Sequence, residues 1–319
     1  MKCKRCKDLA VVALPSHHAG FCRACFLGFF SRQVEKAIAK QKLFTLEDRI
    51  LVAVSGGKDS LALMLELAEQ GYNVTGLHVD LSIPNSSEAA RSVVESFCAR
   101  HGLNLQVKTL ADEGLAIPLV KERLSRPICS ACGKIKRYFF NKAALDGDFT
   151  VLATGHNLDD EIARLFSNVL RWDLSYLSDQ GPHLPACNGF ARKVKPLFRL
   201  SEFETANYAF LKGIDYHTAP CPYSAGASFT FHKTLWEDLE LEMPGRKLEF
   251  YLGFLERGRP VFAAREAEIG ETVAPCELCA YPTSGGVCGV CRIREMVREM
   301  VAERLEGESH KGLAPYDGE

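Results

Sequence analysis

The sequence predicts an α/β protein in which a parallel sheet carries helices on both faces. From residue 49 onward, short apolar runs rich in valine, leucine and isoleucine alternate with longer segments in which apolar residues recur every three or four positions. Strands that alternate with helices pair in parallel, because each helix crosses back over the sheet. The chain has 319 residues, of which 47% are hydrophobic, so it can bury a large core and form more than one domain.

Four strands and the helices that follow them are expected in order. The expected strands cover residues 49–55, 73–80, 103–110 and 149–155. The expected helices cover residues 60–70, 87–102, 133–145 and 159–172, and residues 201–256 read as helical around a loop at 220–226. Polar turns follow three of the strands, at 55–60, 78–80 and 155–160. Because ligands of parallel sheets bind beyond the carboxyl ends of the strands, these turns are the expected binding region.

The thirteen cysteines sort by their spacing. Two Cys-x2-Cys pairs stand near each end of the chain: Cys3, Cys6, Cys22 and Cys25, and Cys276, Cys279, Cys288 and Cys291. Each doubled pair offers four thiolates, the ligand set of a structural Zn²⁺ site. The sequence therefore predicts zinc lobes at residues 1–28 and 263–304 around a central domain of residues 29–262, with a disordered tail at 305–319.

A third Cys-x2-Cys pair, Cys129 and Cys132, has no fourth pair to complete a zinc site, and Cys221 between prolines is its natural third member. Three thiolates fit a 4Fe–4S cluster with one open iron. They also fit a relay that carries a persulfide and resolves it as a disulfide, or a zinc site completed by a histidine. The spacing alone does not decide among these three schemes. Cys98 is expected in a buried helix face, and Cys187 in a loop.

Residues 55–60, Ser-Gly-Gly-Lys-Asp-Ser, join the first strand to the first helix. Two glycines let backbone N–H groups approach an anion, and the helix that follows offers its positive end. Ser55 and Ser60 add hydroxyl groups, while Asp59 suits a Mg²⁺ ion or orients the loop. The sequence therefore predicts a phosphate site, although the spacing differs from the GxxxxGK[ST] loop and from GxGxxG.

The segments MKCKRC, FCRAC, VAVSGGKDSLAL, CSACGKIKR, ATGHNLDDE, APCPYS and MPGRK occur in this order along the chain. Together they resemble the PP-loop ATP pyrophosphatases and, within them, the TtuA branch of tRNA 2-thiolation enzymes. The resemblance covers nearly the whole chain, up to about residue 300. It implies that ATP adenylates the C2 oxygen of a uridine, that sulfide displaces AMP, and that 2-thiouridine results.

The resemblance also implies the residues that bind the nucleotide and the sulfur. The expected ATP residues are Ala53, Ser55, Gly56, Gly57, Asp59, Ser60, His78, Lys136 and Gly155, with Asp160 near Mg²⁺. Asp59, Lys136 and Asp160 are expected to be catalytic, and Cys129, Cys132 and Cys221 are expected to hold a 4Fe–4S cluster that carries sulfide. Asp159 and Glu161 read only as acids at a helix N-terminus.

The implied partners are tRNA, modified at the T-loop uridine 54, a ubiquitin-like sulfur carrier ending in a thiocarboxylate, and a second copy of the chain in a homodimer. One departure concerns the target base. Relatives tend to read Leu-Arg-Gly-Asp where this chain has Trp172, an aromatic that either stacks on a base or packs. The N-terminal lobe of relatives often ends in histidine, where this chain has Cys25.

Charge and hydropathy narrow the function classes further. The formal net charge is −1, so only local basic patches can attract nucleic acid. No apolar run is long enough to span a membrane and the N-terminus lacks a signal peptide, so a cytoplasmic enzyme is expected. The alternatives are thiolation of the wobble uridine or of a cytidine, an amide-forming PP-loop ligase, and a non-catalytic RNA-binding protein built on zinc lobes. ATP consumption that depends on tRNA separates the last of these from the enzymes.

Overall fold

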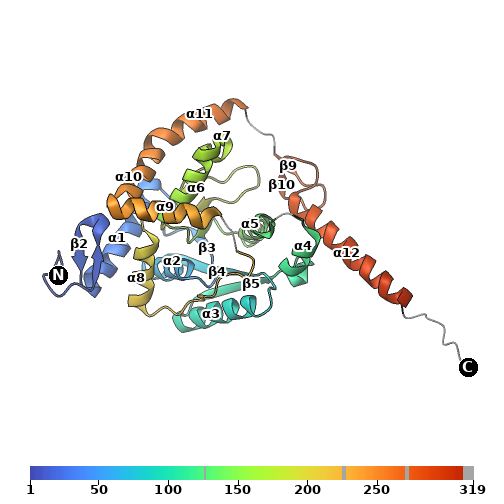
Figure 1. Cartoon of the computed structure of the whole chain (residues 1–319), viewed down its shortest axis with the longest axis horizontal. Coiled ribbons are helices and arrows are strands. Elements are labelled where there is room, and N and C mark those ends of the chain that lie inside the picture. Colours follow the sequence, from blue (N-terminus) through green and yellow to red (C-terminus); the bar gives the residue numbers. More distant parts are fainter. Residues whose placement is uncertain (126, 225–227, 270–272, 312–319) are drawn as a thin grey trace, which may run out of the picture.

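A central sheet of six strands organises the molecule, as the computed structural model shows (Figure 1). The structure describes residues 1–125, 127–224, 228–269 and 273–311. The strand order is β5-β4-β3-β6-β8-β7, parallel except for β7, which runs antiparallel to β8. The strands of this sheet are β3 (Arg49–Ala53), β4 (Asn73–Asp80), β5 (Asn104–Thr109), β6 (Val151–Thr154), β7 (His183–Leu184) and β8 (Lys193–Val194).

The predicted fold class and its four strands are confirmed, with strand ends within two residues of those expected. Strands β7 and β8 were not predicted, because two residues carry no readable alternation. The helices are α1 (Arg23–Gln41), α2 (Lys58–Glu69), α3 (Ser86–His101), α4 (Ile117–Arg123), α5 (Ile128–Asp146), α6 (Leu158–Arg171), α7 (Leu174–Ser178), α8 (Glu202–Lys212), α9 (Ser228–Glu242), α10 (Arg246–Gly253), α11 (Arg259–Ile269) and α12 (Gly289–Lys311).

Three boundaries differ by more than two residues from the expected ones, the first being that α8 ends at Lys212, well before the loop expected at 220–226. Helix α5 begins at Ile128, so Cys129 and Cys132 lie in its first turns and not in a loop before it. The cysteine pair looked like a turn in sequence, but Pro127 stands at the N-cap and opens the helix there. Helix α12 continues to Lys311 and so includes the first part of the stretch expected as a disordered tail. Its run of Glu, Arg, Leu and Met favours a helix, and the remainder of that stretch, residues 312–319, lies outside the described residues.

The two faces of the sheet have separate cores, and each core includes one of the terminal lobes. Ile50 and Val52 point to one face, where they join a cluster that contains Phe21 from the N-terminal lobe and Phe30 from helix α1. Leu51 points to the other face, because successive strand residues alternate, and joins a cluster with Ile293 of the C-terminal lobe. The terminal lobes are therefore parts of the two cores.

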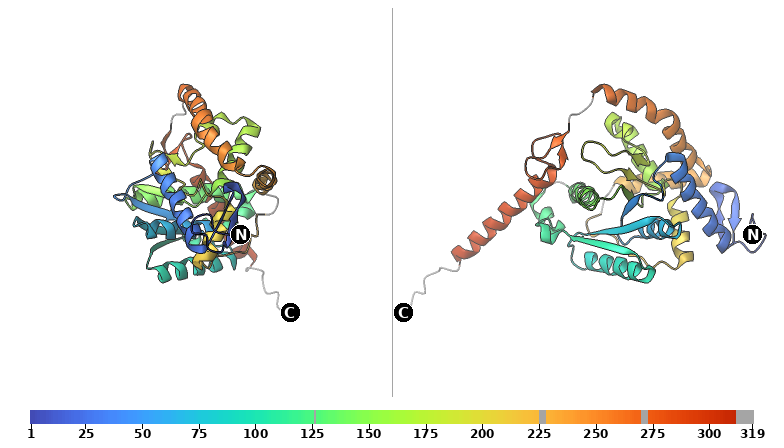
Figure 2. Two further views of the ribbon diagram at one scale, coloured as in Figure 1. Left: turned by 90° about the vertical axis from the view of Figure 1, so that its left-hand side faces the viewer. Right: turned by 180° about the vertical axis from the view of Figure 1, so that it is seen from behind.

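The two lobes lie at opposite ends of the molecule (Figure 1). The N-terminal lobe holds the hairpin β1 (Val12–Leu14) and β2 (Ala19–Phe21), and the C-terminal lobe holds β9 (Ala274–Pro275) and β10 (Pro282–Thr283). Figure 2 shows α12 projecting from the C-terminal lobe, away from the sheet. Among the described helices, none is both long enough and apolar enough to cross a membrane.

Candidate functional site

A cavity of about 490 Å³ opens at the carboxyl ends of strands β3, β4 and β6. That volume suits a nucleotide-sized ligand. Ten of the residues expected from the sequence line it: Ala53, Ser55, Gly57, Asp59, Ser60, His78, Lys136, Gly155, Asp160 and Cys221. Sequence reasoning missed the apolar side chains that complete the wall, among them Leu81, Ile83 and Phe140, because an apolar residue in a wall looks like any core residue.

The loop of residues 55–60 is held by its own hydrogen bonds. The hydroxyl of Ser60 donates to the carbonyl of Gly57 over 3.0 Å and accepts from the N–H of Ser55 over 3.2 Å. The N–H of Gly57 donates to Ser55 Oγ over 3.3 Å. Gly57 is the N-cap of α2 and makes no side-chain cap, so the helix presents uncapped N–H groups beside the cavity. This is the arrangement that binds phosphate at a helix N-terminus.

Two glycines of the site are required by their surroundings. Gly56 has φ +85°, a left-handed conformation that favours glycine, and a Cβ there would lie 3.0 Å from the carbonyl oxygen of Ala90. A Cβ on Gly155 would lie 2.8 Å from the backbone N of Ser60, which leaves no room for a side chain. Gly56 does not itself line the cavity, but it permits the turn that brings Ser55 and Gly57 to it.

Asp59 and Asp160 both reach the cavity, from helices α2 and α6. Asp59 accepts hydrogen bonds from Asn157 over 3.2 Å and from the hydroxyl of Thr205, and lies 3.1 Å from Lys58 Nζ. Asp160 forms a capping box with Asn157, which fixes the start of α6. Both carboxylates are therefore held in place, and carboxylate oxygens are the donors that Mg²⁺ prefers.

Two lysines and a third carboxylate complete this charge cluster. Glu202 of α8 lies 2.8 Å from Lys58 Nζ and 2.9 Å from Lys233 Nζ, and Lys233 Nζ also lies 2.7 Å from Asp160. Partial burial alone would raise the pKa of Glu202, but the two ammonium groups lower it to about 2. The three carboxylates outnumber the two ammonium groups by one, so the cluster favours an added cation.

His78 stands buried at the wall of the cavity. Its Nδ1 lies 2.9 Å from the carbonyl oxygen of Val54, which can only accept, so Nδ1 carries the proton. Burial lowers the pKa of His78 and keeps the ring neutral. Its Nε2 is buried and finds no partner among the described residues, which leaves an acceptor for an N–H of a bound ligand.

The acids on either side of Asp160 form buried ion pairs, whereas the sequence suggested only acids at a helix N-terminus. Asp159 is 3% exposed and pairs with the buried Lys247 of the MPGRK segment. Glu161 pairs with Lys195 at 2.7 Å and accepts a hydrogen bond from Tyr251. Sequence reasoning missed these pairs, since the partners come from distant elements. The lysine of MPGRK, a segment without an assigned role, was the one available signal.

The three remaining cysteines of the expected set gather beside the cavity. Cys221 lines it, and on α5 Cys129 lies two turns and Cys132 one turn before Lys136. Burial raises the pKa of Cys132, and the positive charge of Lys136 opposes that shift. The thiols of Cys221 and Cys129 raise the pKa of Cys132 further, so both lie near enough to influence it. Cys187 is exposed in a loop and Cys98 is buried in α3, as expected.

These three sulfurs are spread more widely than those of the terminal quartets. Among the described residues, only the two quartets bring three or more possible ligand atoms within 4.8 Å of one another. A single ion needs close-set ligands, whereas each cysteine of a 4Fe–4S cluster binds a different iron at a separate corner. As they stand, these three sulfurs do not form a close-set site for a third zinc ion among the described residues.

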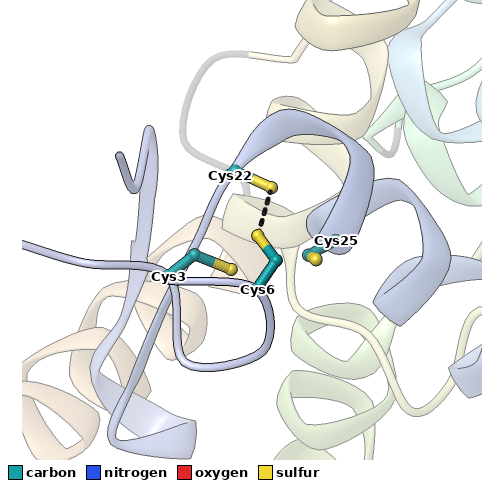
Figure 3. Close-up of side chains that lie close together, drawn as sticks. All are labelled: Cys3, Cys6, Cys22 and Cys25. Atoms are coloured by element: carbon teal, nitrogen blue, oxygen red, sulfur yellow. Dashed lines mark hydrogen bonds between the residues drawn. The ribbon is translucent and has the colours of Figure 1, made fainter. Parts of the chain in front are cut away.

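The N-terminal quartet is shown in Figure 3, where the thiols of Cys3, Cys6, Cys22 and Cys25 face one another. The sulfurs of Cys6 and Cys22 are 3.4 Å apart. Backbone N–H donors, first that of Cys6, lower the pKa of the Cys3 thiol to about 6, whereas the pKa values of the Cys6 and Cys25 thiols are raised, so one thiolate is favoured before a metal binds. Four thiols at these distances fit one tetrahedral soft metal ion.

The C-terminal quartet has the same design. Cys276, Cys279, Cys288 and Cys291 lie within 4.8 Å of one another, and the N–H of Cys288 donates to the sulfur of Cys276 over 3.2 Å. Burial raises the pKa of Cys276, yet such N–H donors bring it down to about 6. The two expected quartets are thus assembled as the spacing predicted, and each could hold a metal.

Comparison with known proteins places this arrangement in one group. Residues 29–223 match the PP-loop domain, and residues 2–27 match the N-terminal LIM domain of 2-thiouridine synthetase TtuA. The chain is 42% identical to the tRNA-5-methyluridine(54) 2-sulfurtransferase of Thermus thermophilus, over 95% of this chain and 94% of that protein. It is 39% identical to the Pyrococcus horikoshii protein of the same name, over 94% of this chain and 96% of the relative.

A solved structure agrees. The U34-tRNA thiolase NcsA from Methanococcus maripaludis, with its 4Fe–4S cluster, superimposes with a TM-score of 0.78 at 25% identity, covering 92% of this chain and 96% of the other. Domain matches at the N-terminal lobe and the central sheet, and relatives aligned along almost the whole chain, lead to one conclusion. The chain belongs to the TtuA group of PP-loop tRNA 2-thiolation enzymes.

Proposed function

We propose that this chain is an ATP-dependent tRNA sulfurtransferase that converts the T-loop uridine 54 into 2-thiouridine. Three relatives named tRNA-5-methyluridine(54) 2-sulfurtransferase, which thus act at C2 of the same position, are 42%, 39% and 37% identical to it over 94% or more of the chain. The observation that carries the proposal is the composition of one cavity. The phosphate loop, Asp59, Asp160, Lys136 and Cys221 all line it, so nucleotide chemistry and sulfur chemistry share one space.

In the first step the C2 oxygen of uridine attacks the α-phosphorus of ATP, the bond to the β-phosphate oxygen breaks, and pyrophosphate leaves, while the N3 proton is lost to solvent and a C2=N3 double bond forms. A urea-like carbonyl is a poor electrophile, and this step turns its oxygen into part of a leaving group. The N–H groups at the start of α2 and the ammonium of Lys136 stabilise the charge at the phosphates. Asp59 and Asp160 would hold Mg²⁺, which when bound neutralises phosphate oxygens.

The neutral ring of His78 accepts a hydrogen bond from an N–H of the adenine through its free Nε2. In the second step hydrosulfide attacks C2, the C2–O bond breaks, AMP leaves with the oxygen, and the proton on sulfur moves to N3. Cys129, Cys132 and Cys221 would hold a 4Fe–4S cluster, which when bound supplies an iron without a protein ligand for the sulfide. Cys129, Cys132 and Lys136 share one face of α5, because they are spaced by three and four residues. That face keeps the sulfur source next to the α-phosphate.

Zn²⁺ in the two quartets is assigned a structural role, because four thiolates leave no open position for a substrate. A ubiquitin-like sulfur carrier with a C-terminal thiocarboxylate is proposed as the donor of sulfide, and the active form is proposed to be a homodimer in the cytoplasm. Relatives 28% identical to this chain are named cytoplasmic tRNA 2-thiolation protein 1, which supports that location.

The wobble uridine is the second candidate target, since NcsA is a U34-tRNA thiolase. The deciding experiment incubates the anaerobically reconstituted protein with unmodified tRNA, ATP, Mg²⁺ and sulfide, and maps modified nucleosides by mass spectrometry. We expect 2-thiouridine at position 54, with AMP and pyrophosphate formed only when tRNA is present. Thiolation at position 34 would reassign the target. ADP and phosphate as products, or no dependence of ATP cleavage on tRNA, would contradict the reaction itself.

A further inference from the structure

Helix α6 ends at a tryptophan whose backbone is fixed in an unfavourable conformation. The N–H of Trp172 bonds to the carbonyl of Val169 and the N–H of Asp173 to that of Asn168, each over 3.1 Å. This pair of bonds defines a Schellman motif, in which Trp172 takes the position that glycine usually fills. Trp172 has φ +49°, a left-handed conformation that is costly for any residue with a Cβ.

Burial of the Trp172 side chain does not offset the cost of this backbone conformation. The side chain of Trp172 is 68% exposed, whereas the only other tryptophan, Trp236, is 9% exposed. Of the two interpretations open from the sequence, packing is therefore wrong. Three other apolar side chains within four residues of Trp172 in sequence are exposed too, and we call this set the Trp172 patch: Leu170, Trp172, Leu174 and Tyr176. Clustered exposed apolar side chains of this kind mark a binding surface.

The charges next to the Trp172 patch favour a nucleic acid as its occupant. Arg164 and Arg171 are both exposed on α6 and, seven residues apart, lie on the same side of the helix. Asp173, next to Trp172 in sequence, keeps its negative charge while its carboxylate accepts from the N–H of Tyr176 over 3.2 Å as the N-cap of α7, so two arginines stand against one acid here. Arginine beside an exposed aromatic ring suits an RNA strand whose unstacked base lies on the ring.

The position of the patch relative to the cavity agrees with this. Asp160 lines the cavity near the start of α6, and Trp172 follows the end of the same helix twelve residues later. At the rise of an α-helix these positions are about 18 Å apart. An RNA that places one nucleotide in the cavity easily extends that far. Since α6 is rigidly capped at both ends, the patch lies at a fixed distance from the reaction centre.

We propose that Trp172 stacks on an unpaired base of the RNA substrate, outside the nucleotide being modified, and so helps to choose which RNA and which position is presented to the cavity. The inference rests on the proposed function in that the RNA is taken to be tRNA. The backbone strain at Trp172 is then the cost of holding the indole ring ready before the substrate arrives. A protein partner at the patch is the rival occupant.

The test uses the whole chain and its two tryptophans. Intrinsic fluorescence is recorded while an unmodified tRNA transcript, or a fully paired duplex RNA of equal length, is added. We expect tRNA to quench the emission, the duplex to quench it much less, and Trp172→Phe to lose the tRNA-dependent quenching, because the buried Trp236 remains. Affinity for tRNA, measured by anisotropy, should fall about tenfold in Trp172→Gly and much less in Trp172→Phe, which keeps a ring.

Stability separates a binding role from a structural one. Trp172→Gly relieves the left-handed conformation, so its melting temperature should stay the same or rise, while its tRNA affinity falls. Phe210→Ala is the matched control, since Phe210 is 80% exposed on α8, away from the patch, and should leave tRNA affinity unchanged. Equal quenching by tRNA and duplex would show that RNA contacts Trp172 without a base stacked on it, and wild-type affinity in Trp172→Gly would leave the surface to a protein partner. Either result would overturn the proposal.

Failure of the proposed function has a different signature. If the wild-type chain does not thiolate tRNA with ATP and sulfide, but tRNA still quenches Trp172 and Trp172→Gly weakens binding, the stacking contact stands and the reaction is wrong. If thiolation proceeds and Trp172→Gly leaves the KM for tRNA unchanged, the reaction stands and the stacking contact is wrong.

Discussion

Replacing Lys247 by methionine should destabilise the fold far more than an ordinary surface substitution. Lys247 is 4% exposed and Asp159 is 3% exposed, and their ion pair joins α10 to the first turn of α6. In Lys247→Met the Asp159 carboxylate stays buried and retains one other hydrogen bond, from the N–H of Glu202 at 2.7 Å. Removing one partner of a buried pair costs about 3 to 5 kcal/mol, since the other charge is left uncompensated.

The assay is thermal or urea unfolding of the full chain. For a chain of 319 residues the unfolding entropy is about 0.7 kcal/mol/K, so a loss of about 3 kcal/mol lowers the melting temperature by roughly 4 to 5 °C. Arg246→Met is the matched control, because Arg246 is next in sequence and, among the described residues, pairs only with the exposed Glu249 at 2.6 Å. That exposed pair contributes at most about 1 kcal/mol, so the control should melt close to the wild type.

A second variant tests the electrostatic reasoning itself. Lys247→Met combined with Asp159→Asn removes both charges but keeps an oxygen that can accept from the N–H of Glu202. The double variant should therefore be more stable than Lys247→Met alone, a non-additive result typical of coupled residues. If the two single effects simply add, or if Lys247→Met melts like Arg246→Met, the buried ion pair is not what anchors α10.

Four further results are expected. Cys279→Ser should lower zinc content and stability while leaving iron in place, as measured by metal analysis; iron in the quartets would refute the zinc assignment. Lys136→Ala should lower kcat for AMP and pyrophosphate formation more than ATP affinity, and a raised KM alone would instead indicate ground-state binding. Anaerobic reconstitution should give about four irons per chain, lost in air, and thiolation should disappear in each alanine variant of the cluster cysteines but not in those of the other two; full activity without iron would favour the persulfide relay. The residues for this last series are Cys129, Cys132 and Cys221, with Cys98 and Cys187 as controls. Because the pKa of Glu202 is lowered to about 2, its stabilising charge is fully present above its unfolded pKa near 4.3 and is lost as pH falls toward 2, so Glu202→Gln should flatten the acid limb of the stability curve.

Local chemistry made much of the fold predictable. Short stretches of sequence are enough to recognise the strand-helix alternation, the doubled cysteine pairs and the Ser-Gly-Gly-Lys-Asp-Ser turn. The structure forms each of them as expected. Strands β7 and β8 were missed because their pairing depends on neighbours in the sheet and not on their own two residues. The start of α5 was misplaced for a related reason, since a cysteine pair suits a turn and a first helical turn equally well.

The site was predictable only as far as each residue acts through its own chemistry. Asp59, Lys136 and Asp160 were expected at the cavity, and they line it. The roles of Glu202 and Lys233 were invisible, because each acts through partners 31 to 144 positions away in sequence. Long-range charge pairs of this kind leave no period or spacing in the sequence, so only the folded chain reveals them.

The run Asp159-Asp160-Glu161 explains why the central acid is the one available to a metal. Successive helix positions point about 100° apart, so three adjacent acids cannot all face one cavity. Asp159 turns to Lys247 of α10 and Glu161 to Lys195 beyond β8, and both carboxylates are buried and neutralised there. Asp160 alone lines the cavity, and its lysine partner, Lys233, is shared with Glu202. One helical turn thus anchors three elements and presents a single carboxylate to the nucleotide, which is why damage to the outer two acids should act through stability and damage to Asp160 through catalysis.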